Sequence, residues 1–509
     1  MHRLNLIIKF THYFKVMWLY QFSFNFFFSW LLSEILYLLY VLIFISPNLN
    51  KTSRKNAKSS NYLFKNPNDS FLGIYNLCDW LKNYDLDRFF SGCFLQADLS
   101  EVYSENYNSF IAWAVYCSEF KDLTEEEKIE VINLREEASK RLKTTIKEGY
   151  NPKATHAKIT LEPTRFIHQP LCIYLFIILL EIYTRITLRR MGFKRLNLSG
   201  VMYWIRDRKY RNRGRNLEVE KNINKLSKPS DENFKQPPIL ILHGICTGWA
   251  YYQKLIEALG GDRTVILVDY EIIKIGILPS FYYVNPLEFN HIIQNILNIH
   301  GIPKVVSLEI YNIFCFLYYY CYCYITLQIS LIGHSWGTCN ASWILRMSPE
   351  IVSQVVLIDP ACLTLVLPDS LYCLLYKPPT SIADYLLCYF VRYGINLSYT
   401  LHNNFDWYNS AFSLEDLSNH IGIVVGVAEK DFLINSKVVV EMVEKLKNTR
   451  ESMRKVKNNQ DDSASISKNH IGPIKFIEWL NVTHGESILS NDKMDQIVAM
   501  IKSNESEMN

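Results

Sequence analysis

The chain has 509 residues, with 54 basic and 50 acidic side chains, and 49% of its residues are hydrophobic and 14% aromatic. A net charge of +4 is too small at this size to indicate a nucleic-acid partner, and the aromatic content argues against a disordered chain. The 12 cysteines are too few for a dense disulfide framework and include no pair with zinc-finger spacing, so the composition indicates a large globular chain with room for about three domains.

The first predicted element is an apolar run at residues 17–46, whose one acidic residue is Glu34. A bilayer core of roughly 30 Å needs about 20 apolar residues, so this run is long enough to cross it. It is longer than the apolar region of a cleaved signal peptide, and no small-residue cleavage site follows it. We interpret residues 1–70 as a membrane anchor and a polar linker. Basic residues flank the run on both sides, so its orientation stays open.

Residues 71–170 are the next predicted unit, and their pattern is helical. Thr124 and Glu127 have the spacing of a capping box, directly ahead of apolar residues at helical intervals. This arrangement predicts a helix that begins after Thr124.

A second apolar segment occupies residues 171–190, but it contains Glu181 and Arg185. Three interpretations stay open: a membrane span, a helix at the membrane interface and a buried core helix. We interpret residues 191–237, which begin with many basic side chains, as a basic linker. By the positive-inside tendency, these charges place the rest of the chain on the cytosolic side of the membrane. The alternative is a solvated linker without topological meaning.

From residue 238 to about residue 500, short apolar runs alternate with helical segments. Continuous apolar strands with helices between them predict an α/β fold, with a mostly parallel sheet covered by helices on both faces. The predicted strands are 239–242, 265–268, 329–332, 355–358, 421–427 and 473–480. The predicted helices are 251–259, 286–299 and 341–346.

The sharpest motif is Gly333-His334-Ser335-Trp336-Gly337, between a predicted strand and a predicted helix. In this context a G-x-S-x-G sequence is typical of a tight turn that holds a serine hydroxyl above the sheet. Glycines are needed on both sides because a Cβ there would collide with the neighbouring chain. The start of the helix favours the negative charge that develops beside the serine. The motif therefore predicts Ser335 as a nucleophile.

His243 and Gly244 form a second motif, directly after the predicted strand 239–242. A serine nucleophile that attacks a carbonyl needs two backbone N–H groups to stabilise the tetrahedral oxyanion. One belongs to the residue after the nucleophile, Trp336, and the other to the loop after an early strand, for which we choose Ile245. The alternative for this motif is an ordinary turn at the end of a strand.

The serine hydroxyl also needs a base, and the base needs an orienting acid. In this kind of fold the acid and then the histidine follow the serine in the chain. Asp431 and His484 come just after the predicted strands 421–427 and 473–480, at carboxyl ends, where active sites form. Asp359 also ends a strand and is the alternative acid.

With these residues the chain resembles the α/β-hydrolase superfamily. Over about residues 75–500 it resembles a fungal-type, membrane-anchored branch of that superfamily whose substrate is undefined. The resemblance to the branch rests on residues 113–114, 170–190, 201–204, 238–244, 341–346, 357–360, 377–380 and 389–391. The resemblance implies that Ser335, Asp431 and His484 form a catalytic triad that hydrolyses esters or related acyl bonds, with no cofactor and no metal ion.

Residues 306–328 depart from this resemblance, because the family would pass directly from Val305 into the strand at Ile329. The segment is rich in Tyr, Phe and Cys, which suits no solvated loop, and a membrane pass here would separate Ser335 from the rest of its sheet. We hypothesise an intron translated in frame, since its Val-Ser start and Leu-Gln end can be encoded as GTA AGT and TTA CAG, which match splice ends. A mature transcript that retains the segment would refute this hypothesis.

Residues 363–413 are too long and too apolar for a connector, and they predict a helical cap over the active site. An ordinary pair of core helices is the alternative. An apolar cap together with a membrane anchor suggests a lipophilic acyl substrate and a bilayer partner. The expected function is a membrane-associated serine hydrolase of lipophilic carboxylic esters. An acyltransferase with the same triad and an inactive membrane scaffold are the alternatives.

Overall fold

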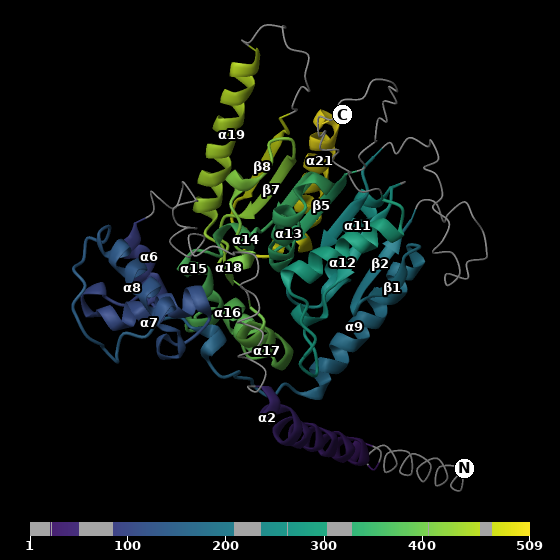
Figure 1. Ribbon diagram of the computed structural model, residues 1–509. Helices are drawn as coiled ribbons and strands as arrows, with labels where there is room; N and C mark the ends of the chain where they lie inside the picture. Colours follow the sequence, from purple (N-terminus) through teal and green to yellow (C-terminus); the bar gives the residue numbers. More distant parts are fainter. Residues whose placement is uncertain are drawn as a thin grey trace, which may run out of the picture.

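The computed structural model describes residues 21, 23–49, 85–207, 236–261, 263–302, 328–405, 407–458 and 471–508. At its centre lies an eight-stranded sheet with the order β1-β2-β4-β3-β5-β6-β7-β8 (Figure 1). The strands are β1 (Lys194–Leu198), β2 (Val201–Arg206), β3 (Ile239–Leu242), β4 (Val265–Asp269), β5 (Ile329–His334), β6 (Val352–Ile358), β7 (Gly422–Ala428) and β8 (Ile474–Trp479). The pairs β1–β2 and β2–β4 are antiparallel, and all the other pairs are parallel.

Alternate residues of the central strands pack on opposite faces of this sheet. In β3, Leu240 and Leu242 join one apolar core, whereas Ile239 and Ile241 join the other. The first core is covered by α12 (Pro286–Ile299), α13 (Trp336–Met347) and α19 (Ser436–Asn458). The second is covered by α9 (Leu171–Arg190), α11 (Gln253–Gly260) and α21 (Asn491–Met508). A parallel sheet between two helical layers, with β3 at the point where the strand order reverses, is the α/β-hydrolase fold, as predicted.

The predicted strands and helices of this domain are all present. Strand 239–242 and helix 286–299 have the predicted bounds. Helix α13 begins earlier than predicted, because the chain becomes helical directly after Ser335. Upstream of the sheet, the capping box is confirmed. The amide of Glu127 donates to Thr124 Oγ1 (3.3 Å), and the amide of Thr124 donates to the Glu127 carboxylate (2.8 Å) at the start of α8 (Glu125–Ser139).

The interpretation of residues 191–237 as a linker is wrong for its first part, which forms the β1–β2 hairpin. The basic side chains of β1 lie on the outer edge of the sheet, where charge is tolerated. In β2, Tyr203 and Trp204 are buried, and the strand pairs with β4. The basic residues of this segment therefore led to its interpretation as a linker, although the apolar residues of β2 were present in the sequence. Residues 208–235 lie outside the described part of the chain.

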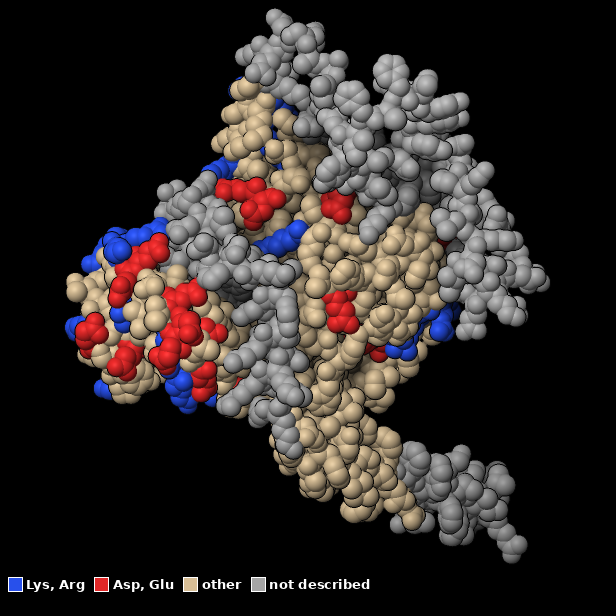
Figure 2. All heavy atoms as spheres, in the orientation of Figure 1, with Lys and Arg blue, Asp and Glu red and all other residues tan. Residues whose placement is uncertain are grey.

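Before the sheet, the chain forms a long apolar helix and a helical region. The helices here are Ser23–Leu49, α6 (Leu86–Cys93), α7 (Ser104–Tyr116) and α8. Figure 1 shows the helix Ser23–Leu49 projecting from the body, and Figure 2 shows no charged side chain on its visible face. By length and composition, this helix and α9 could each cross a membrane. The beginning of the predicted run 17–46 and most of the predicted linker lie outside the described residues.

Between β6 and β7, where the cap was predicted, the chain is helical. The elements are α14 (Ala361–Thr364), α15 (Pro368–Leu371), α16 (Ile382–Leu387), α17 (Ile395–Asn403), α18 (Trp407–Ser410) and two π-helical turns, Tyr372–Tyr376 and Cys388–Arg392. From this segment Phe405 packs against Trp336, the residue after the predicted nucleophile, with 5.3 Å between the ring centroids. The helical segment therefore adjoins the predicted site. Almost all of the insert at 306–328 lies outside the described residues.

Candidate active site

Ser335 lies on a strained turn between β5 and α13. Its backbone angles, φ 50° and ψ −120°, are ones that a residue with a side chain rarely adopts. The turn is held by the Ser335 amide, which donates to the carbonyl of Ile358 (2.9 Å). A Cβ on Gly337 would overlap the carbonyl of Leu242, and one on Gly333 would lie 2.8 Å from the Gly337 carbonyl oxygen. Both glycines are therefore required for the turn that exposes the serine.

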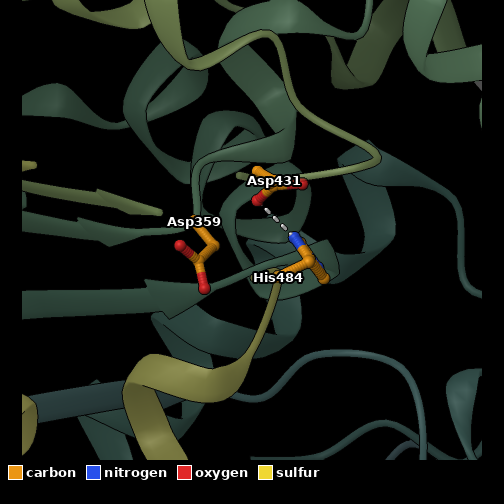
Figure 3. Close-up of side chains that lie close together, drawn as sticks. All are labelled: Asp359, Asp431 and His484. Carbon is orange, nitrogen blue, oxygen red and sulfur yellow. Dashed lines mark hydrogen bonds and ion pairs between the residues drawn. The ribbon is translucent and has the colours of Figure 1, made fainter. Parts of the chain in front are cut away.

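The structure brings Ser335, His484 and Asp431 into one hydrogen-bonded chain. Ser335 Oγ lies 2.8 Å from His484 Nε2, and His484 Nδ1 lies 2.7 Å from Asp431 Oδ2 (Figure 3). The other oxygen of Asp431 accepts the amides of Leu433 (2.8 Å) and Ile434 (2.9 Å), which fixes the carboxylate. The three residues follow β5, β8 and β7, which are parallel, so their loops meet at one edge of the sheet. These are the contacts that a Ser-His-Asp triad makes.

Asp359, the alternative acid, lies beside the same histidine but contacts its loop instead of its ring. One oxygen accepts the amide of Ala428 (3.1 Å), and the other accepts the amide of Gly485 (2.9 Å) and the hydroxyl of Ser487 (3.1 Å). In Figure 3 the dashed hydrogen bond of the His484 ring runs to Asp431 and not to Asp359. Burial disfavours ionisation of Asp359, but the neighbouring imidazoles outweigh it and lower its pKa. The ionised carboxylate therefore holds the loop that carries the histidine.

Asp359, Asp431 and His484 are also the residues that could hold a metal ion, since their potential ligand atoms lie within 4.8 Å of one another. Both ring nitrogens of His484, however, already lie within hydrogen-bond distance of Asp431 and Ser335. A metal ion would have to displace one of these partners. The contacts present are the two hydrogen bonds of His484, to Ser335 and to Asp431.

The predicted oxyanion loop lies against the nucleophile. A Cβ on Gly244 would lie 3.0 Å from Ser335 Cβ and 2.9 Å from His334 Nδ1. Within the described residues, the amides of Ile245 and Trp336 donate to no backbone carbonyl outside regular elements. Trp336 begins α13, and the first amides of a helix have no acceptor in the helix itself. In the described residues these two amides therefore have no backbone acceptor outside the regular elements, as their predicted role in an oxyanion hole requires.

A buried polar chain, which sequence reasoning missed, joins the three parts of the site. The Gly244 amide donates to Tyr252 Oη (2.9 Å), which in turn lies 2.7 Å from His334 Nδ1. His334 Nε2 lies 3.6 Å from Asp359, which binds the loop of His484. Burial lowers the pKa of His334, although the neighbouring Asp359 opposes this effect. The neutral ring therefore accepts a hydrogen bond from the Tyr252 hydroxyl at Nδ1. Tyr252 belongs to no motif, so nothing in the sequence singles it out.

His243 has a structural part in this region. Its ring is buried, its Nδ1 lies 2.8 Å from the carbonyl oxygen of Gly244, and its Nε2 accepts the Tyr270 amide (3.3 Å). Burial lowers its pKa to about 4. His243 is therefore neutral at neutral pH, and both of its ring nitrogens are engaged with backbone groups, Nδ1 with the Gly244 carbonyl and Nε2 with the Tyr270 amide.

The pKa of His484 leads to a pH prediction. Burial lowers this pKa, but the ion pair with Asp431 outweighs burial and raises it to about 9. Below that pH the imidazole is protonated and cannot accept the serine proton, so we expect kcat/KM for an acetyl ester to rise about tenfold per pH unit up to about 9 and then level off. The raised pKa also stabilises the fold below about pH 6.5, and this contribution is lost as the pH rises through 9. A rate profile from pH 6 to 10 measures the midpoint; a plateau that begins at pH 7 would contradict this prediction.

No protein-family model and no curated protein matches the chain. Among solved structures, a naproxen esterase from Bacillus subtilis is similar at 11% identity and a TM-score of 0.34, over 61% of this chain and 91% of that one. A membrane phospholipase A described as a bacterial virulence factor is similar at 12% identity and 0.39, over 66% and 96%. Carboxyl esterase 2 from the fungus Tuber melanosporum reaches 17% identity and 0.36, over 62% and 87%. These sequence identities and TM-scores are too low to carry the fold assignment. It rests instead on the strand order of the sheet in this chain, which is that of the α/β-hydrolases.

Proposed function

We propose that this chain is a membrane-associated serine hydrolase that cleaves lipophilic carboxylic esters. The observation that carries the proposal is the pair of hydrogen bonds from Ser335 to His484 (2.8 Å) and from His484 to Asp431 (2.7 Å). In such a chain, the histidine takes the serine proton as the oxygen attacks the ester carbonyl and then returns it to the leaving alcohol. A water molecule then attacks the acyl-enzyme by the same steps of proton transfer and releases the carboxylic acid.

The supporting groups have separate parts in this reaction. Asp431 holds the imidazole with Nε2 toward the serine and stabilises the imidazolium that forms. The amides of Ile245 and Trp336 bind the oxyanion of the tetrahedral intermediate, and losing one such donor typically costs about 10²–10³ in rate. The residues named are sufficient for ester hydrolysis without a cofactor.

The proposed membrane association rests on two apolar helices that lie together. The Leu171 amide, at the start of α9, donates to the Glu34 carboxylate (2.7 Å), and Tyr37 packs on Tyr174. The apolar side chains on the outer face of α9 are exposed: Leu175, Phe176, Leu179, Ile182, Tyr183 and Ile186. The opposite face of α9 packs on the α/β domain, and Leu188, near the end of the helix, is fully buried there.

A helix that is packed lengthwise on a domain is not free to cross a bilayer alone. We therefore place α9 at the membrane interface and assign the helix Ser23–Leu49 as the membrane anchor. The cytosolic placement stays a prediction from the basic residues.

The proposal predicts a preference for long acyl chains. Full-length protein in phospholipid vesicles is given an acetyl ester and a long-chain ester of the same alcohol. We expect free acid from both and a kcat/KM at least about tenfold higher for the long chain, because each buried methylene contributes about 0.8 kcal/mol. The measurement is product analysis by mass spectrometry, with glycerol added in a parallel sample.

Two outcomes would contradict this proposal. Acyl groups that appear on glycerol in preference to water would identify an acyltransferase, which uses the same triad with an alcohol in place of water. An absence of any product, together with no labelling of Ser335 by a fluorophosphonate, would identify an inactive scaffold.

A further inference from the structure

A cavity of about 220 Å³ lies between α9, the segment that follows β4 and the cap helix α17. Most of its wall is apolar and includes Tyr174, Ile177 and Ile178 from α9 and Ile275 and Ile277 from the segment after β4. None of the triad residues lines it. The cavity is therefore a separate space, and its occupant has to be argued from its surroundings.

The oxyanion loop separates this cavity from the nucleophile. Gly244 lies against Ser335, and the next residue, Ile245, packs in an apolar cluster with Tyr174 and Ile275 of the cavity wall. The loop is fixed there, since the Cys246 amide donates to the Ile273 carbonyl (3.2 Å) and the Ile275 amide donates to the Cys246 carbonyl (2.8 Å). The oxyanion loop thus adjoins the nucleophile through Gly244 and the cavity wall through Ile245, so a chain that runs along this loop from a carbonyl at Ser335 is directed toward the cavity.

The mouth of the cavity opens on the apolar outer surface of the domain. The exposed lining residues include Ile178 at 44% and Leu278 at 39%, and the charged Glu271 is exposed beside them. Close by in the chain, Leu179 of α9 and Phe281 after the lining segment are exposed as well. This is the surface that the proposed function places at the membrane interface, so the mouth faces the acyl region of the bilayer.

The polar end of the cavity does not suit an ionic ligand. The Lys274 ammonium lies 2.9 Å from Glu271, 3.0 Å from Asp269 and 3.6 Å from Glu181. Arg185 pairs with Glu181, and Arg195 pairs with Asp269 and Glu271, so the three cations and three carboxylates of this cluster already balance one another without an added phosphate or carboxylate. The ion cluster instead ties α9 to the segment after β4 and keeps the two walls together. A neutral, apolar chain is the occupant that fits.

We propose that this cavity takes the acyl chain of the ester, which enters from the bilayer beside α9 and passes Ile245 to place its carbonyl at Ser335. The proposal rests on the proposed function and adds the route and the binding site of the chain. Each methylene that leaves water for an apolar cavity is worth about fourfold in affinity. The cavity therefore makes the enzyme selective for chains longer than those that end at Ile245.

The test compares two alkyl fluorophosphonates, one with a methyl and one with a dodecyl chain on phosphorus, on full-length protein in phospholipid vesicles. Ser335 Oγ attacks phosphorus, its proton passes to His484, and the P–F bond breaks with loss of fluoride. Ile178→Trp places an indole at the mouth of the cavity. Leu179→Trp is the matched control, because this neighbour is exposed at 55% and does not line the cavity.

We expect Ile178→Trp to lower the rate constant of labelling by the dodecyl probe at least about tenfold and to leave the methyl probe unchanged. Leu179→Trp is expected to change neither rate. Equal effects of Ile178→Trp on both probes, or the same dodecyl rate in the two variants, would overturn the cavity proposal while the labelled serine still supports a hydrolase. If neither probe labels the unmodified protein, the proposed function itself fails, and this proposal fails with it.

Discussion

Ser335→Ala is expected to remove ester turnover and fluorophosphonate labelling while leaving the fold intact. The hydroxyl is the group that attacks the carbonyl, and loss of a triad nucleophile lowers kcat by about 10⁴-fold or more. The side chain makes one hydrogen bond, to His484, and alanine keeps the same Cβ on the same strained backbone. The measurements are initial rates on an acetyl ester and the midpoint of urea unfolding, which we expect to stay close to that of the unmodified protein.

Ser452→Ala is the control for this experiment. Ser452 lies on α19 and is exposed, and among the described residues its hydroxyl bonds to the carbonyl of Asn448 in its own helix (2.9 Å). It should keep full activity. An active Ser335→Ala variant would show that the nucleophile lies elsewhere, and an inactive variant with a lowered unfolding midpoint would show that the turn, and not the hydroxyl, was lost.

The parts of the fold that could be predicted are those encoded by neighbouring residues. Strand β3 is a continuous apolar run, because both of its faces are covered, and it was predicted with the observed bounds. The G-x-S-x-G motif is equally local, since Gly337 is needed to pass the carbonyl of Leu242. The β1–β2 hairpin was missed because its basic edge strand has the composition of a linker, although Tyr203 and Trp204 indicate burial.

The network behind the site could not be predicted, because its members come from separate parts of the chain. Tyr252 joins Gly244 to His334 only once α11 has packed against the sheet. The sequence favoured Asp431 as the acid but kept Asp359 as the alternative for the same reason, since both follow a strand and either could reach the histidine. The contact with His484 Nδ1 depends on how far each loop extends beyond its strand, and no local sequence pattern encodes this distance.

That contact is the basis of the second large effect, in which Asp431→Asn is expected to lower kcat by about 10⁴-fold. Asp431 accepts the Nδ1 proton of His484 at 2.7 Å, which leaves Nε2 free to receive the serine proton. An asparagine amide favours the other tautomer, with the proton on Nε2, where it cannot act as a base. Without the carboxylate, the pKa of His484 should also fall, so the midpoint of the pH profile should move below that of the unmodified protein.

Asp359→Asn is the comparison that decides between the two acids. Both oxygens of Asp359 accept hydrogen bonds, from the amides of Ala428 and Gly485 among others, and an asparagine can keep those of one oxygen only. The loop of His484 would then be held less firmly, and small displacements of a catalytic group cost about 10²-fold. We therefore expect a smaller loss of kcat than for Asp431→Asn. If Asp359→Asn proves the more damaging change, Asp359 orients His484 during the reaction, and the contact with Asp431 belongs to a resting arrangement from which the histidine loop must move.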